Sequence, residues 1–147
     1  MTPRLVLVGP PASGKTTVGT AVAAALGVAF RDTDADVEAV ARALAEHDGV
    51  LALGGGAVTD EATRALLVGY GKDGGTVVRL DVDLHSAAKR VGLSRDRPLL
   101  AVNPRAMLRT MLEARAPLYA EVATVTVETG GRTPGDVIAE VLQVIQR

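Results

Sequence analysis

Gly9-Pro10-Pro11-Ala12-Ser13-Gly14-Lys15-Thr16 stands between the apolar run Leu5-Val6-Leu7-Val8 and a stretch with the pattern of an amphipathic helix. The spacing G-x-x-x-x-G-K-[ST], in the order strand, loop, helix, is typical of a loop that holds nucleotide phosphates. Backbone N–H groups in such a loop point at one anion, and the start of the helix adds further donors and a positive dipole end. The stretch therefore predicts a nucleoside triphosphate site, for ATP or GTP, in an α/β fold.

Each residue type in this loop suits that chemistry. Lys15 supplies a mobile cation for the outer phosphates, which makes it a candidate catalytic residue, and the Thr16 hydroxyl is a candidate Mg²⁺ ligand. Thr17 is expected in the helix, near the phosphates. The other candidate phosphate-binding residues are Gly9, Ala12, Ser13 and Gly14. A turn that joins strand and helix without binding anything is the alternative, and the flanking pattern disfavours it.

Composition is that of one domain with one hydrophobic core. The 147 residues, 48% of them hydrophobic, are sufficient for it, and no internal repeat or low-complexity linker divides the chain. The formal charge of −1 favours a small-molecule partner over a nucleic acid or an anionic membrane. There is no cysteine for a disulfide or thiolate metal site. No leader or apolar run of about 18 residues is evident, so a cytoplasmic monomer is expected.

Short β-branched runs alternate with helical patterns, which is typical of parallel strands joined by crossover helices. The sequence therefore predicts a single domain, residues 1–147, folded as a three-layer α/β sandwich with a five-stranded parallel sheet, the P-loop NTPase fold. Strands are expected at residues 4–8, 28–31, 50–53, 76–80 and 124–127. Helices are expected at residues 15–26, 36–46, 60–68, 84–91, 104–115 and 134–146. Thr59 is expected to cap the third of these helices.

Two acidic residues end the second predicted strand. Asp32 and Asp34 are two positions apart, so an extended chain directs both side chains to one face. In phosphoryl transfer, one carboxylate would hold Mg²⁺ through water and the other would accept a hydrogen bond from the attacking hydroxyl. Capping of the next helix is the alternative reading, and it is preferred for Asp36.

Two further loops follow strand ends, where ligands bind in open parallel sheets. Gly54, Gly55 and Gly56 are consecutive, so their backbone can approach a ligand closely, although consecutive glycines also occur in ordinary turns. Residues 92–98 form a polar segment that includes Arg95 and Arg97 and is bounded by glycine and proline. We interpret it as a lid that closes over the phosphoryl group, with a solvated charged loop as the alternative.

Taken together, these motifs make the chain resemble shikimate kinase. This small P-loop kinase phosphorylates the 3-hydroxyl of shikimate with Mg-ATP in the biosynthesis of aromatic amino acids. The resemblance covers most of the chain. Its motifs are Gly9 to Thr16, Asp32-Thr33-Asp34, Leu53-Gly54-Gly55-Gly56-Ala57, Arg97-Pro98-Leu99-Leu100, Arg115-Ala116-Pro117-Leu118-Tyr119 and Arg132-Thr133-Pro134. The first motif is shared by P-loop proteins in general, whereas the other five in this order are specific.

The resemblance implies roles for individual residues. It implies that Asp34 orients the substrate hydroxyl and that Asp32 supports Mg²⁺ through water. The glycines 54–56 contact the substrate, and Arg115 pairs with its carboxylate. Arg97 belongs to the lid and neutralises phosphate charge as a catalytic residue. The residues that correspond to the adenine site are Arg90, Arg132 and Pro134.

One segment of the family pattern is missing. Relatives carry a substrate-binding helical insertion with a Phe-Arg-x-x-Glu element between the Asp-Thr-Asp and Gly-Gly-Gly motifs, and its arginine also holds the shikimate carboxylate. Here the insertion is absent between about residues 38 and 42, and the role of its arginine is not transferred to Arg42. Either the chain is truly shortened, or a mobile segment is omitted from the printed sequence. The second explanation is favoured because the flanking motifs are intact.

Three functions are therefore open. The leading hypothesis is ATP-dependent phosphorylation of shikimate to shikimate 3-phosphate. The second is a P-loop kinase for another small hydroxy acid, such as gluconate. The third is a nucleotide-binding protein without transfer activity. In that case the missing segment, which forms one side of the acceptor site in relatives, would leave that site incomplete.

Overall fold

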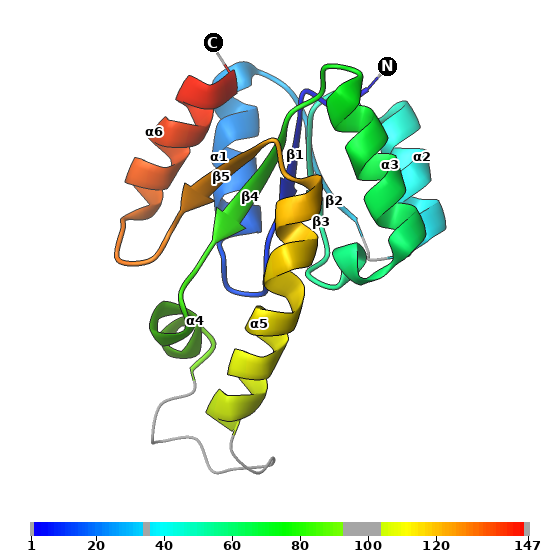
Figure 1. Cartoon of the computed structure of the whole chain (residues 1–147). Helices are drawn as coiled ribbons and strands as arrows, with labels where there is room; N and C mark the ends of the chain where they lie inside the picture. Colours follow the sequence, from blue (N-terminus) through cyan, green and yellow to red (C-terminus); the bar gives the residue numbers. More distant parts are fainter. Residues whose placement is uncertain (1, 34–35, 93–103, 146–147) are drawn as a thin grey trace.

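The computed structural model describes residues 2–33, 36–92 and 104–145. Its centre is a sheet of parallel strands, ordered β2-β3-β1-β4-β5 (Figure 1). The strands are β1 (Leu5–Val8), β2 (Phe30–Thr33), β3 (Val50–Leu53), β4 (Val77–Asp81) and β5 (Val125–Glu128). The strand that precedes the phosphate loop is therefore central, and it is buried at every position, as a parallel strand covered on both faces must be.

Helices cover both faces of this sheet (Figure 1). One face carries α1 (Lys15–Leu26) and α6 (Pro134–Ile145). The other carries α2 (Val37–Glu46), α3 (Glu61–Lys72) and α5 (Pro104–Val122). Successive side chains of a strand point to opposite faces, so Leu5 and Leu7 pack with the first pair of helices and Val6 and Val8 pack with the second group. The predicted three-layer fold with five parallel strands is confirmed.

Several details differ from the sequence prediction. Strand β2 is Phe30–Thr33 and not residues 28–31, and α3 ends at Lys72 and not at residue 68. Helix α5 does not end at residue 115 but continues to Val122, although Pro117 removes a backbone donor from its interior. Burial of Tyr119 and Val122, each 2% exposed, offsets this cost. Thr59 does not cap α3, because it ends the short 3-10 helix η1 (Ala57–Thr59) and donates to the Gly56 carbonyl; the cap is Asp60, which accepts from the backbone N–H of Ala62.

The loops that follow the strands meet at one edge of the sheet, which is the lower edge in Figure 1. The Gly54 N–H donates to the Thr33 carbonyl at 3.0 Å, which attaches the glycine loop to the end of β2. On the other side of β1, the Thr129 N–H donates to the Asp81 carbonyl at 2.9 Å and so joins the ends of β5 and β4. Helix α4 (Leu84–Arg90) follows β4 at the same edge. The described loops that carry several of the predicted site residues are therefore neighbours at this edge of the sheet.

Candidate active site

The backbone of the phosphate loop packs closely against β4 and has a conformation that can bind anions. A Cβ on Gly9 would lie 2.6 Å from the Leu80 carbonyl oxygen, so only glycine allows the chain to leave β1 so close to β4. Ala12 has a left-handed φ of 70°, which costs about 1–2 kcal/mol for an L-residue. Such left-handed turns make concave nests of N–H groups that bind phosphate. A cavity of about 250 Å³ lies here, lined by Ala12, Gly14, Lys15, Thr16 and Thr17.

Lys15 lies at the start of α1 and folds back over its own loop. Its Nζ donates to the carbonyl oxygens of Gly9 at 2.7 Å and of Pro10 at 3.0 Å. Burial lowers the pKa of Lys15 to about 8; the Asp32 carboxylate opposes this shift and the Arg115 guanidinium adds to it. The Asp32 carboxylate and the Arg115 guanidinium are therefore close enough to influence the Lys15 amine, although the three groups come from β2, α5 and α1.

This pKa leads to a prediction about proton uptake. At about pH 8.5 much of the free protein holds a neutral Lys15 amine, and phosphate contact favours the charged form. ATP binding should then take up a proton, and ATP affinity should fall as the pH rises through 8. Calorimetric titrations in two buffers of different ionisation enthalpy measure this uptake. Equal heats in both buffers would contradict the prediction, and a Lys15→Met variant provides the baseline.

Two side chains with oxygen atoms, Thr16 and Asp32, lie close to each other beside the phosphate loop. The Thr16 hydroxyl donates to an Asp32 carboxylate oxygen at 3.3 Å, and both side chains are exposed. No cluster of three or more histidine, cysteine or acidic residues that could hold a metal occurs in the described part of the chain. Mg²⁺ characteristically uses only one or two protein ligands and completes its shell with water and substrate phosphates. The Thr16–Asp32 pair fits that mode of binding.

Arg90 connects the phosphate loop to the loop after β5. Its Nη1 donates to the Ala12 carbonyl at 2.9 Å and to the Thr129 hydroxyl at 3.1 Å, and its Nη2 donates to the Thr129 carbonyl at 2.8 Å. The buried Thr129 hydroxyl in turn donates to the Asp81 carbonyl. Arg90 therefore holds the strained Ala12 in place by bridging it to Thr129. The sequence analysis did not predict this role.

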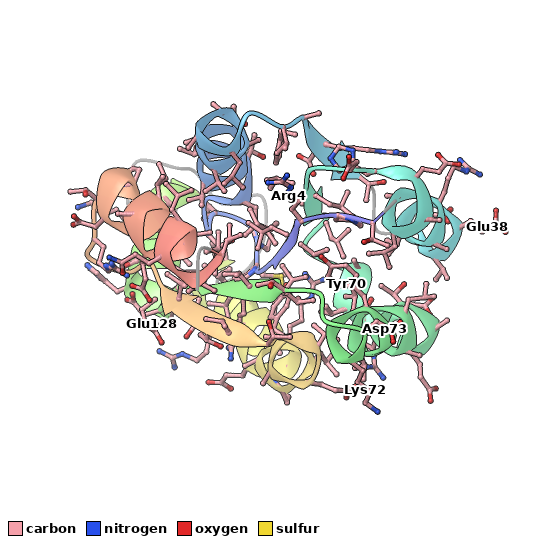
Figure 2. The ribbon with its side chains drawn as sticks, turned by 90° about the horizontal axis from the view of Figure 1, so that it is seen from above. Arg4, Glu38, Tyr70, Lys72, Asp73 and Glu128 are labelled. Carbon is pink, nitrogen blue, oxygen red and sulfur yellow. The ribbon has the colours of Figure 1, made fainter. Side chains whose placement is uncertain are left out.

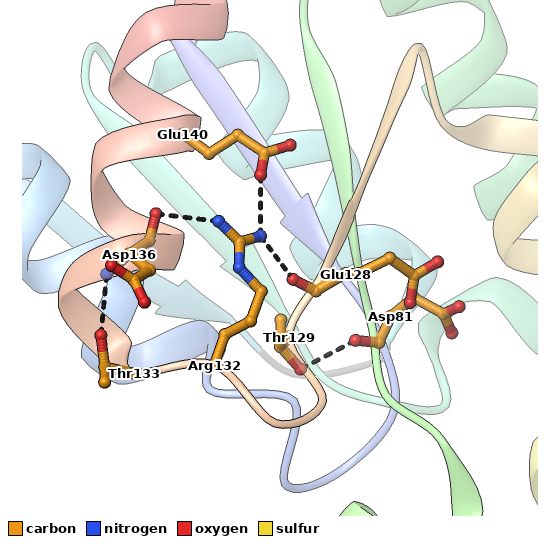
Figure 3. A network of polar contacts seen from close by, with 7 residues as sticks. All are labelled: Asp81, Glu128, Thr129, Arg132, Thr133, Asp136 and Glu140. Carbon is orange, nitrogen blue, oxygen red and sulfur yellow. Dashed lines mark hydrogen bonds and ion pairs between the residues drawn. The ribbon is translucent and has the colours of Figure 1, made fainter.

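A second cavity of about 250 Å³ adjoins the loop. It is lined by Ala12, Ser13, Gly14, Thr17, Val18, Arg90, Thr129, Arg132, Pro134 and Val137. The residues predicted for the adenine site are thus brought together. Figure 3 shows how Arg132 is held: its Nη1 donates to the Glu140 carboxylate at 2.7 Å and to the Glu128 carbonyl, and its Nη2 donates to the Asp136 carbonyl. Because this ion pair is partly exposed, its main effect is to orient the side chain.

Among the described residues, Arg115 and the glycine loop, both predicted to contact the acceptor, lie close together. A Cβ on Gly56 would lie 3.7 Å from Nη2 of Arg115, and a Cβ on Gly55 would lie 3.0 Å from Cδ of Pro11. The glycine loop is therefore packed between the phosphate loop and α5. Arg115 projects from α5 toward it, close enough to Lys15 to affect its pKa. The Arg115 guanidinium thus lies beside the glycine loop and acts electrostatically on Lys15 of the phosphate loop.

The structure adds polar groups that sequence reasoning did not select. Tyr119 donates from its hydroxyl to the Gly55 carbonyl at 2.6 Å. It lies one helical turn after Arg115, and this i, i+4 spacing was the available signal. Arg79 and Asp81, two positions apart on β4, form an ion pair at 3.3 Å. These three residues and Pro10 are part of the lining of a cavity of about 300 Å³ between β4 and α5.

Some predicted site residues lie outside the described residues. They are Asp34, Arg97 and all of the predicted lid from residue 93 onward. Their assigned roles stay predictions. For the described residues, the structure brings together Lys15, Thr16 and Asp32 on one side, and Arg115 with the glycine loop on the other.

A phosphate loop after the central strand of a parallel sheet, with acidic and arginine side chains at the same edge, defines the class of P-loop kinases. Solved structures agree: a shikimate kinase from Acinetobacter baumannii in complex with shikimate superimposes with a TM-score of 0.81 at 32% identity, covering 99% of this chain and 93% of that one. The shikimate kinase family model matches residues 11–42 and 35–146. The chain belongs to the shikimate kinase family.

Sequence relatives support the same family. A shikimate kinase of Salinispora arenicola is 54% identical over 166 aligned positions, which cover 96% of both chains. One of Streptomyces avermitilis is 47% identical and covers 98% of this chain and 96% of its own. A gluconokinase from Sinorhizobium meliloti, at 23% identity and a TM-score of 0.70, shares the fold. None of the described helices is long and apolar enough to cross a membrane.

Proposed function

We propose that this chain transfers the γ-phosphoryl group of ATP to the 3-hydroxyl of shikimate, giving ADP and shikimate 3-phosphate. The observation that carries the proposal is the position of Arg115. Its guanidinium lies beside Gly56 and acts electrostatically on Lys15. A group that can bind the carboxylate of the acceptor is therefore close to the phosphate loop. Membership of the shikimate kinase family supports the choice of acceptor.

Lys15, Asp34 and Arg97 would have separate roles in an in-line transfer of the phosphoryl group. The Lys15 ammonium group would leave the Gly9 and Pro10 carbonyls and contact the negatively charged β- and γ-phosphates. Asp34 would accept the hydrogen bond of the attacking hydroxyl and hold that oxygen in line with the γ-phosphorus. Arg97 would neutralise the phosphoryl group from the lid. In such a reaction positioning and charge neutralisation supply most of the rate.

We further propose that Thr16 and Asp32 hold Mg²⁺, Thr16 directly and Asp32 through water. Their oxygens are 3.3 Å apart and both side chains are exposed, which suits an ion that keeps most of its water shell. When bound, Mg²⁺ would supply charge neutralisation for the phosphate oxygens. Arg90, Arg132 and Pro134 would hold the base in the cavity that they line. A cytoplasmic location and a monomeric state stay predictions.

A panel of acceptors tests the proposal. The purified protein is incubated with ATP and Mg²⁺, and ADP release is measured with shikimate, gluconate or no acceptor. We expect release that depends on shikimate and is at least about a hundredfold slower with gluconate, because a site built to hydrogen-bond one substrate rejects analogues with different groups. Faster release with gluconate would favour the alternative kinase.

The carboxylate anchor makes a separate prediction. Arg115→Ala removes a charge-assisted fork, so the KM for shikimate should rise about tenfold to a hundredfold. The KM for ATP should change by less than about twofold, since the adenine cavity is lined by other residues. Arg105→Ala, an exposed arginine on the same helix, is the control. Equal effects of the two substitutions on shikimate KM would contradict the assignment.

One observation favours a second candidate, a nucleotide-binding protein without transfer activity. The 166 positions aligned with the Salinispora arenicola relative exceed the 147 residues of this chain, so the relative has residues where this chain has none. The family model also matches residues 35–42 twice, as expected where a segment is missing. Intact mass decides the cause: 15.1 kDa indicates a true deletion, and a heavier chain indicates omitted residues. ATP binding without shikimate-dependent ADP release would support this candidate.

A further inference from the structure

Tyr119 is a buried polar residue at the edge of the acceptor side. Only 2% of it is exposed, and its hydroxyl donates to the Gly55 carbonyl at 2.6 Å. Gly55 is the middle residue of the glycine loop, between the loop's attachment to β2 at Gly54 and the approach of Arg115 at Gly56. The phenol thus fixes the loop at the one position where neither of those contacts acts.

The same hydroxyl also interacts with Arg115. The two residues are four positions apart on α5 and so share one side of the helix. Burial raises the pKa of Tyr119, and the nearby Arg115 side chain partly opposes this shift. The phenol therefore stays protonated at neutral pH. A hydroxyl that donates to Gly55 can at the same time accept from the guanidinium.

These contacts join the two groups that would receive the acceptor. Arg115 Nη2 lies 3.7 Å from where a Cβ of Gly56 would stand, so the glycine loop and the guanidinium are neighbours. Tyr119 donates a hydrogen bond to the glycine loop and interacts electrostatically with the guanidinium. A long arginine side chain loses rotamer entropy when it binds a carboxylate, and a fixed orientation reduces that loss. Supporting Arg115 before the substrate arrives should therefore increase affinity.

We propose that Tyr119 is a positioning residue for the acceptor, which holds the Gly55 carbonyl and the Arg115 guanidinium in the orientation that receives shikimate. The inference rests on the proposed function and adds a residue to it. Tyr119 acts through its neighbours and need not touch the substrate. Its contribution should consequently appear in acceptor binding and leave ATP binding unchanged.

A purely structural role is the competing explanation, and the chain contains a matched control. Its other tyrosine, Tyr70, donates from its hydroxyl to the Pro3 carbonyl, also at 2.6 Å. Figure 2 looks down on the opposite edge of the sheet and shows Tyr70 there, near Arg4. Tyr119→Phe and Tyr70→Phe each remove one phenol-to-carbonyl hydrogen bond and keep the ring in place. The two variants differ in location and not in chemistry.

Steady-state kinetics of the two variants test the proposal. Tyr119→Phe should raise the KM for shikimate about tenfold, with kcat and the KM for ATP within about twofold of the unsubstituted protein. Tyr70→Phe should leave all three constants unchanged. Thermal melting of both variants shows that each is folded. An unchanged shikimate KM in Tyr119→Phe, or an equal rise in both variants, would overturn the proposal.

Tyrosine fluorescence gives a second, independent readout. The chain has two tyrosines and no tryptophan, so Tyr70→Phe emits from Tyr119 alone and Tyr119→Phe emits from Tyr70 alone. We expect shikimate to change the emission of Tyr70→Phe and to leave that of Tyr119→Phe constant. The reverse result would count against the inference. If the unsubstituted protein has no shikimate-dependent turnover, the proposed function fails; if it turns over and only the Tyr119 effects are missing, the inference alone fails.

Discussion

Replacing Lys15 by methionine is expected to lower kcat by about a hundredfold to a thousandfold, the range measured when a single preorganised donor to developing charge is removed. Methionine keeps the length of the side chain and removes its charge. Among the described residues that line this cavity Lys15 is the only cation, because the others are alanine, glycine and threonine. ATP affinity should also fall, since the outer phosphates lose their cation.

The measurement is shikimate-dependent ADP release, combined with direct titration of ATP. Lys72→Met is the matched control, since Lys72 is exposed at the end of α3 and lies with Tyr70 and Asp73 away from the phosphate loop (Figure 2). It should retain full activity. If Lys15→Met kept more than about a tenth of the normal kcat, the proposed role of Lys15 in charge neutralisation would be wrong.

The second large effect is expected at Asp34. Asp34→Asn keeps the size of the side chain and removes the charge that would accept the hydrogen bond of the attacking hydroxyl. Loss of a positioned base typically costs about a hundredfold to ten-thousandfold in rate. We therefore expect kcat to fall by that factor while ATP affinity stays nearly constant, because the predicted role of Asp34 concerns the acceptor.

Asp36→Asn separates this role from helix capping. The Asp36 carboxylate accepts from the N–H groups of Glu38 and Ala39 at the start of α2, and asparagine caps helices equally well. Asp36→Asn should therefore remain active and folded. Similar losses in both variants would indicate that Asp34 acts through the structure of this connection. Full activity of Asp34→Asn would refute its role toward the hydroxyl.

Much of the fold could be predicted because its signals are local. The phosphate loop sets the end of β1 and the start of α1, and Lys15–Leu26 agrees with the expected helix at both ends. The end of α5 could not be predicted in this way, because Pro117 is a local stop signal and the burial of Tyr119 and Val122 that overrides it depends on the assembled sheet. Local rules fail here because tertiary packing decides.

The candidate site likewise has a part that could be predicted from the sequence and a part that could not. Motif spacing selected Lys15 and Thr16 as candidates, because binding of phosphates requires those residue types in that order. Spacing does not describe contacts between distant loops. The support of Ala12 by Arg90, the link from Thr129 to Asp81, and the hydrogen bond from Tyr119 to Gly55 all join segments far apart in the sequence.

Transfer of label from [γ-³²P]ATP to shikimate tests the central claim most directly. The purified protein is incubated with labelled ATP, Mg²⁺ and shikimate, and the product is separated and its phosphorylated oxygen is assigned by NMR. We expect the label on the 3-oxygen of shikimate, with one ADP formed for each phosphoryl group transferred. Saturable ATP binding with all of the label left in ATP or released as free phosphate would contradict the account.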